Sequence, residues 1–175
     1  MSDMYEKVQK AGAHERRRPA LWIIIVAAVA GLSVLAAIII HPLYAHRRFM
    51  RYIGQLSEDT VYATEADCLR CELADGTALR LTVENAYAVY NKLMVSGRGT
   101  HSNDVPAEKG VLLDYGNGAT LQLWPQTFTG KGRSEGVFVQ YTDAAGESYS
   151  YRTNHVSYSN ISAAISPQQN PPWEE

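Results

Sequence analysis

An uncharged run from Ala20 to Ile40 constrains this chain more than any other feature of its sequence. The run carries a single hydroxyl, at Ser33, and lacks the polar stripe that a helix on the surface of a soluble core would show. At the α-helical rise it spans about 30 Å, which is the thickness of the hydrocarbon core of a membrane. The sequence therefore predicts a transmembrane helix over residues 20–40.

The residues that flank this run predict how it is used. The run is longer than the apolar region of a cleaved signal peptide, and Leu43-Tyr44-Ala45 is a poor cleavage site, so we expect an uncleaved signal anchor. Lys and Arg are more frequent before the run than directly after it, and Arg16-Arg17-Arg18 lies closest to it. The positive-inside rule then favours a cytoplasmic N-terminus and an extracellular C-terminal domain. We expect a single-pass protein of the cell membrane.

Charge and composition divide the chain into five segments. Residues 1–49 carry a net charge of +4 and residues 50–175 a net charge of −6. An acidic soluble part does not favour nucleic acid as a partner. The predicted segments are a short basic cytoplasmic tail (1–19), the transmembrane helix (20–40), a juxtamembrane linker (41–59), an extracytoplasmic α+β domain (60–166) and a disordered tail (167–175).

The linker is expected to start with a disturbed helix, because Pro42 lacks an amide hydrogen and clashes with the preceding turn. Beyond it, apolar and basic residues alternate irregularly up to Leu56. An amphipathic helix on the membrane surface and a simple helical stalk both fit this pattern. We expect the soluble domain to begin near Thr60, with a strand at Val61-Tyr62-Ala63.

The soluble domain reads as an antiparallel sheet in the order β-β-α-β-β-β-β-α, with its helices on one face. Turn signals such as Asp75-Gly76 and Gly116-Asn117-Gly118 separate runs of alternating polarity. A helical period over residues 83–95 and a second over 157–165 supply the helices. The four later strands are predicted at Val111–Tyr115, Ala119–Trp124, Val137–Tyr141 and Ser148–Arg152.

The two cysteines, Cys68 and Cys71, form a C-x-x-C pair that suggests a thiol redox site. Such a site places its first cysteine at a helix N-terminus, but here the chain continues into a hairpin. Residues three apart in a strand point to opposite faces, too far apart for a disulfide without a turn between them. We expect Cys71 to be buried and Cys68 to face outward, where it is available to a second copy in a homodimer. No second cysteine pair completes a structural metal site, so no metal and no cofactor is expected.

Long loops are the predicted binding surfaces. The loop Ser96–Gly110 and the loop that follows Trp124 are rich in turn formers, and long loops on a rigid sheet usually carry recognition. No nucleophile, base or metal ligand has a partner at a recognisable spacing, so we do not expect an enzyme. The candidate partner-binding residues are Arg98, His101, Asp104, Trp124, Phe128, Lys131 and Arg133.

The domain resembles the small membrane-anchored extracytoplasmic domains of unknown function found in Gram-positive bacteria. The resemblance rests on the hairpin Leu73–Thr82, the helix Ala86–Leu93, and the strands in Val111–Trp124 and Val137–Tyr141. It implies an outside location and an accessory or sensing role. The sequence as a whole predicts a non-catalytic binding or interaction module for a protein, peptide or envelope ligand, with a thiol-based redox sensor or oxidoreductase at Cys68 and Cys71 as the alternative.

Overall fold

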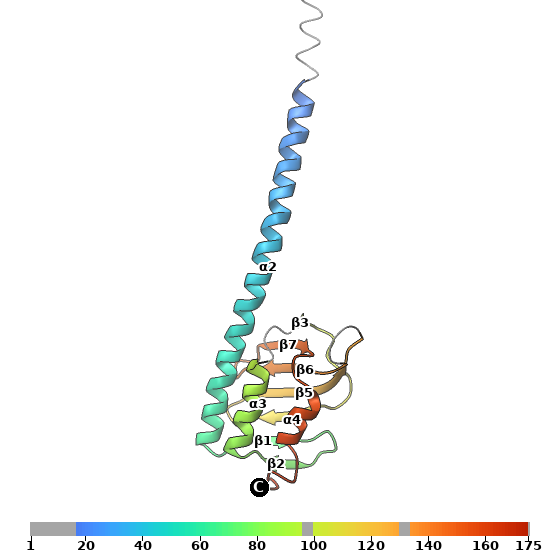
Figure 1. Ribbon diagram of the computed structural model, residues 1–175. Coiled ribbons are helices and arrows are strands. Elements are labelled where there is room, and N and C mark those ends of the chain that lie inside the picture. Colours follow the sequence, from blue (N-terminus) through green and yellow to red (C-terminus); the bar gives the residue numbers. More distant parts are fainter. Residues whose placement is uncertain (1–16, 96–99, 130–133, 175) are drawn as a thin grey trace, which may run out of the picture. The chain divides into compact units, whose positions relative to one another are not determined.

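The computed structural model describes residues 17–95, 100–129 and 134–174, which fall into two compact units, 1–45 and 46–175. Helix α2 (Arg17–Glu65) contributes to both units (Figure 1). In the first unit its large apolar side chains are exposed on all sides. Within the described ranges this is the one helix long and apolar enough to cross a membrane.

The second unit is built on an antiparallel sheet, which confirms the predicted sheet type. Its order is β2-β1-β4-β5-β6-β7-β3. The Asp75-Gly76 turn joins β1 to β2, and Gly76 takes the positive φ of +88° that only glycine adopts without strain. The strands are β1 (Arg70–Glu72), β2 (Ala78–Arg80), β3 (Thr100–His101), β4 (Val111–Asp114), β5 (Thr120–Thr127), β6 (Glu135–Thr142) and β7 (Ser148–Thr153).

Alternation along the strands sorts the side chains onto two faces of the sheet. Cys71 pairs with Leu113, Leu113 with Leu121, and Leu121 with Tyr141, and all four are buried in one core. Their chain neighbours point to the opposite face. Helices α3 (Val83–Val95) and α4 (Tyr158–Ala164) lie on the buried face, in front of the sheet in Figure 1.

The part of α2 after His46 belongs to this domain and covers the same face of the sheet. Phe49 meets Tyr151 of β7 edge-on, and Tyr52 stacks on Tyr149 with ring centroids 4.4 Å apart. Farther along, Leu56 is buried. The helix therefore crosses the strands and serves as a third covering helix that the predicted order lacked.

Three predictions about this region need correction. The strand expected at Val61–Ala63 is helical, because Ala63 continues the buried stripe of Phe49, Tyr52 and Leu56 at helical spacing. Pro42, which was expected to disturb the helix, lies inside α2, and the helix continues past it. The compact domain starts at His46 instead of near Thr60, so most of the expected linker is part of the fold.

The two ends of the sheet also differ from expectation. At one edge, β3 adds a short strand within the predicted loop and pairs with β7. At the other edge the tail is ordered: Leu79 bridges to Pro172, and Asn170 is buried with its side-chain amide donating to Ala164 O and Ser166 O. The tail covers the exposed edge of β2, which would otherwise present unpaired backbone groups.

Candidate functional site

The second face of the sheet carries no helix among the described elements, and its exposed side chains are mostly polar. We call this surface the open face. Its register places Arg70 opposite Asp114, and Asp114 opposite Thr120. Its exposed or half-buried side chains include Arg70, Glu72, Leu112, Asp114, Thr120, Gln122, Gln140 and Thr142. Farther along β5 and β6 the same face carries Trp124 and Phe138, which are buried beneath the segment before β4.

A cavity of about 210 Å³ lies on the open face over β1 and β4. It is lined by Arg70, Glu72, Leu112 and Asp114. Lys109 borders it, because its Nζ lies 2.6 Å from Glu72 Oε1, and this hydrogen bond is the main cause that lowers the pKa of Glu72. Positive and negative side chains therefore alternate around one small depression.

The cross-strand pairing explains why these charges gather there. Arg70 lies directly opposite Arg80, a like-charge pair that is unfavourable by itself. Asp114 flanks Arg70 on the other side, and Asp67 Oδ2 lies 3.0 Å from Arg80 Nη1. The arrangement is electrically balanced, so it suits a ligand with both donors and acceptors better than a strong anion.

Within the described ranges, no group of three or more His, Cys, Asp or Glu side chains is placed to hold a metal ion. A second depression, of about 330 Å³, lies between the β1–β2 turn and α4. Its lining is largely apolar and includes Leu73, Val111, Tyr158 and Ile165. Its polar lining residues are Asp75, Ser162 and Ser166, and Asp75 Oδ1 already accepts a hydrogen bond from Thr77 N.

Of the two predicted binding aromatics, Trp124 is buried and Phe128 is half-buried. Trp124 is only 5% exposed, its indole N–H donates to Glu108 O at 2.8 Å, and its ring meets Phe138 edge-on. Gly110 lies so close to this indole that an added Cβ would be 2.7 Å from it. Phe128 is half-buried beside Gly136 in the same way. Trp124 thus anchors the segment before β4 instead of offering a surface for a ligand.

The remaining loop candidates are scattered. His101 lies exposed in β3, near the ring of Tyr149 at 5.8 Å, and Asp104 is exposed in the segment that follows. Arg98, Lys131 and Arg133 lie outside the described residues. Among the described residues, it is the open face that brings charged side chains together.

The C-x-x-C pair has a different geometry from a redox motif. Cys68 follows the C-terminal end of α2, where Asp67 takes a left-handed φ of +50° and Cys68 N–H donates to Ala63 O. This is the hydrogen bond of a Schellman helix end. Cys68 Sγ lies 3.2 Å from Tyr115 O, and both thiols are free. A helix C-terminus carries partial negative charge, which disfavours a thiolate.

Burial acts in the same direction on both thiols. It raises the pKa of Cys71 to about 12. The pKa of Cys68 is also raised, first by desolvation and then by the charge of Asp114. A nucleophilic cysteine needs the opposite shift.

The signal for the open face was present in the sequence. Arg70, Glu72 and Arg80 lie in the first hairpin at alternating positions, whereas Asp114 and Lys109 come from a later part of the chain. Only the pairing of β1 with β4 brings Asp114 next to Arg70. Comparison with protein-family models, with curated proteins and with solved structures found no match, so the resemblance to membrane-anchored extracytoplasmic domains stays a prediction.

Proposed function

We propose that the chain is a single-pass membrane protein whose C-terminal domain, on the extracellular side, is a non-catalytic binding module. The ligand binds the open face. It is a protein or peptide segment that carries hydrogen-bond donors and acceptors close to one another. The N-terminus is cytoplasmic and residues 20–40 cross the membrane. The module holds its ligand near the cell surface, as the resemblance to anchored extracytoplasmic domains suggests.

The observation that carries this proposal is the contrast between the two faces of the sheet. Three helices cover one face, while the described part of the other presents Gln122, Gln140 and the charged depression at Arg70 and Asp114. Hydrogen-bonding side chains on a rigid sheet are pre-organised, which lowers the entropic cost of binding. Burying the apolar face of the sheet under helices does not by itself require hydrogen-bonding side chains on the opposite face.

The alternative, a thiol sensor or oxidoreductase, has weaker support. It requires a thiolate near neutral pH, whereas burial and Asp114 raise the pKa of Cys68 and burial raises that of Cys71. We therefore place the site on the open face.

Site-specific photocrosslinking in intact cells tests the binding site. A photoreactive amino acid replaces Gln122 or Gln140 on the open face, and matched positions, Tyr62 and Glu84, lie exposed on helices. We expect a defined adduct from Gln122 and Gln140 that Arg70→Ala weakens. Equal adducts from Tyr62 and Glu84, or none from the open face, would contradict the assignment.

Topology needs its own measurement. Glu84 is exposed, so Glu84→Cys in a Cys68→Ser/Cys71→Ser background offers one accessible thiol. We expect a membrane-impermeant maleimide to label it on intact cells. Labelling that appears only after lysis would place the domain in the cytoplasm.

A further inference from the structure

Helix α2 separates its charges within the domain. Its first residues after the apolar run are basic, and its last residues are acidic. The basic residues lie well inside α2, far from its first turn, so the helix dipole does not account for their position. The basic group is His46, Arg47, Arg48 and Arg51, and the acidic group is Glu58, Asp59 and Glu65.

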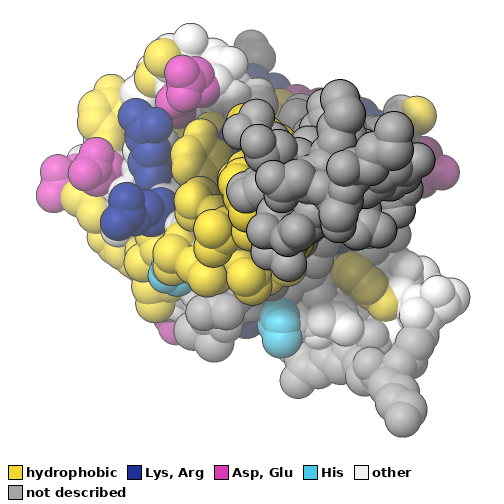
Figure 2. Space-filling model, turned by 90° about the horizontal axis from the view of Figure 1, so that it is seen from above, with side chains coloured by type: hydrophobic (Ala, Val, Ile, Leu, Met, Phe, Trp, Pro, Cys, Tyr) yellow, Lys and Arg dark blue, Asp and Glu magenta, His cyan; other side chains and the backbone are white. Residues whose placement is uncertain are grey.

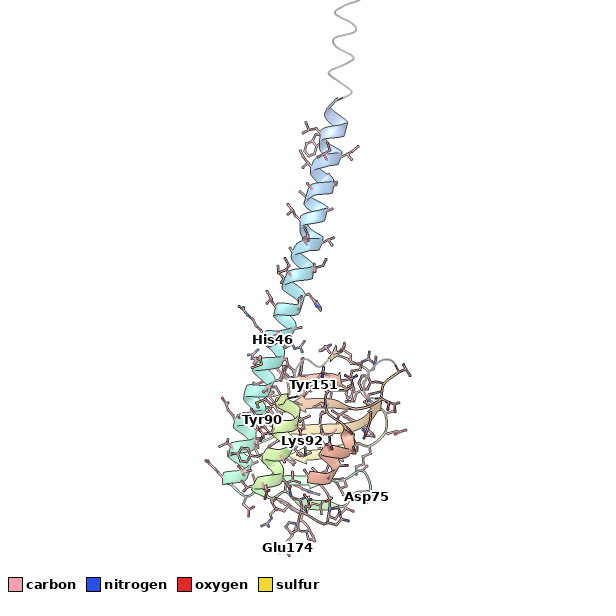
Figure 3. The ribbon with its side chains drawn as sticks, in the orientation of Figure 1. His46, Asp75, Tyr90, Lys92, Tyr151 and Glu174 are labelled. Atoms are coloured by element: carbon pink, nitrogen blue, oxygen red, sulfur yellow. The ribbon has the colours of Figure 1, made fainter. Side chains whose placement is uncertain are left out.

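The two groups lie at opposite ends of the domain. Figure 3 shows His46 and Tyr151 toward one end, and Asp75 and Glu174 toward the other. Seen from above, Lys and Arg side chains lie beside hydrophobic ones in Figure 2. Along α2 itself, the charge changes from basic at residues 46–51 to acidic at residues 58–65.

The arginines of the basic group differ in what they contact. The Arg48 guanidinium lies 5.3 Å from the centre of the Tyr149 ring and 5.9 Å from that of Tyr52, which ties it to the aromatic core. Arg47 and Arg51 are exposed. In the portion of the chain that the structure describes, neither forms an ion pair with an acidic side chain. Two cations at helical spacing are left without a described role in the fold.

The place of these arginines in the chain indicates what they meet. Arg47 follows Ile40, the last residue of the apolar run, by seven residues in the same helix, an advance of about 10 Å. The headgroup layer on each side of a bilayer is about 5–8 Å thick. Arg47 and Arg51 have long side chains that can carry a charge several ångströms from the backbone, as arginines near a membrane interface do. Exposed Met50 adds an apolar side chain between them.

We propose that Arg47 and Arg51 form a binding surface for the phosphate groups of anionic phospholipids in the leaflet that the domain faces. Guanidinium groups bind phosphate through paired hydrogen bonds as well as charge, and juxtamembrane arginines add to membrane binding in this way. The surface holds the domain against its own membrane and leaves the open face on β1 and β4 available to a ligand. This inference rests on the membrane anchorage proposed above.

The test titrates the full chain in mild detergent with soluble phosphatidylglycerol or phosphatidylcholine and counts bound lipids by native mass spectrometry. We expect tighter binding of phosphatidylglycerol. Arg47→Gln/Arg51→Gln should weaken it about 25-fold, because each arginine near an anionic surface contributes about fivefold. Arg47→Lys/Arg51→Lys should restore most of the affinity, and added salt should reduce it.

The matched control, Lys92→Gln/Arg80→Gln, removes two positive charges outside α2, with Arg80 on β2 at the far end of the domain, and should leave lipid binding unchanged. Equal affinity for both lipids, or an equal loss in this control, would overturn the proposal. Inorganic phosphate that displaces the lipid at similar concentration would point to a free phosphate site instead, and would also overturn it. Carbonate extraction of cell membranes distinguishes this failure from failure of the proposed function. A chain that carbonate releases is not anchored in the membrane, which contradicts the proposed function. A chain that is retained but shows no lipid preference contradicts only the inference drawn from Arg47 and Arg51.

Discussion

The two faces of the sheet place the same kinds of residue in opposite environments. In β4, Leu113 is 1% exposed beneath the helices, while its neighbour Leu112 lines the depression on the open face. In β1, Cys71 is buried between half-buried Arg70 and Glu72. Alternation along a strand makes this division, and the helices decide which face becomes the core. The buried face supplies the core, and the other face is where we propose that a ligand binds.

The largest expected effect concerns the thiol on the buried face. A pKa of about 12 against the ordinary 9.0 lowers the thiolate fraction of Cys71 at pH 8 about a thousandfold. We expect maleimide to alkylate Cys71 at least about a thousandfold more slowly in the native chain than in denaturant. In the native chain, half-buried Cys68 should react faster than Cys71. Equal rates for the two thiols in the native chain would show that the β1 register does not bury Cys71. Residue-resolved mass spectrometry follows both rates.

The adjacent leucines of β4 give the most direct comparison of the faces. Leu113→Ala should lower the free energy of unfolding by roughly 2–5 kcal/mol, because it leaves a cavity in the core. Leu112→Ala should cost about 1 kcal/mol or less, as at most surface positions. Urea unfolding of the full chain in detergent, followed by the tyrosine and tryptophan signal, measures both. Similar losses would mean that the open face is covered as well.

Polar residues allow a second comparison between the buried face and the open face. Asp59 of α2 accepts hydrogen bonds from the Tyr141 hydroxyl and, at 2.7 Å, from Asn117 Nδ2, which ties the helix to β6 and to the β4–β5 turn. Asp59→Asn should cost about 2 kcal/mol, because hydrogen bonds to a charged group are lost. Gln122→Ala on the open face should change stability by about 0.5 kcal/mol or less.

A double-mutant cycle of Asp59→Asn with Tyr141→Phe checks that the two groups act together. If the two losses simply add, the hydrogen bond between Asp59 and Tyr141 does not contribute to stability.

The smallest expected effect is the pH dependence of the ion pair on the open face. The Lys109 hydrogen bond lowers the pKa of Glu72 below its ordinary 4.5. A carboxyl group whose pKa is lower in the folded chain stabilises the fold at pH values above its unfolded pKa. This stabilisation is lost as the pH falls through its folded pKa. Urea unfolding from pH 7 to pH 3 should therefore show a shallower acid-side loss in Glu72→Gln than in the wild type. An unchanged slope would mean that Lys109 and Glu72 do not pair in solution.

Much of the fold followed from local patterns. The helix at residues 83–95, the Asp75-Gly76 hairpin and the four strands after residue 110 lie where alternation and turn residues predicted them, within a few residues. The buried stripe of α2 was visible as well, since Phe49, Tyr52 and Leu56 recur at helical spacing. It was not assigned to the core because its neighbours Arg47 and Arg51 suggested a membrane surface.

The candidate site and the ends of the sheet did not follow from local patterns. Trp124 was assigned to a binding surface because it ends a strand, but Gly110 and the Glu108 carbonyl cover it. The tail was expected to be disordered from its composition, but Asn170 finds buried backbone partners and Pro172 reaches the β2 edge. Each of these outcomes depends on a contact between segments far apart in the sequence.

The sequence by itself determined that the chain holds an apolar helix of membrane-spanning length and an antiparallel sheet with helices, because these depend on composition and on periods of two and 3.6 residues. Only the tertiary structure decided that α2 continues from the apolar run into the core, and that Arg70 meets Asp114. Strand order and helix docking are set by the burial of whole faces against one another, and residues such as Tyr52 and Tyr149 become neighbours only after that choice is made.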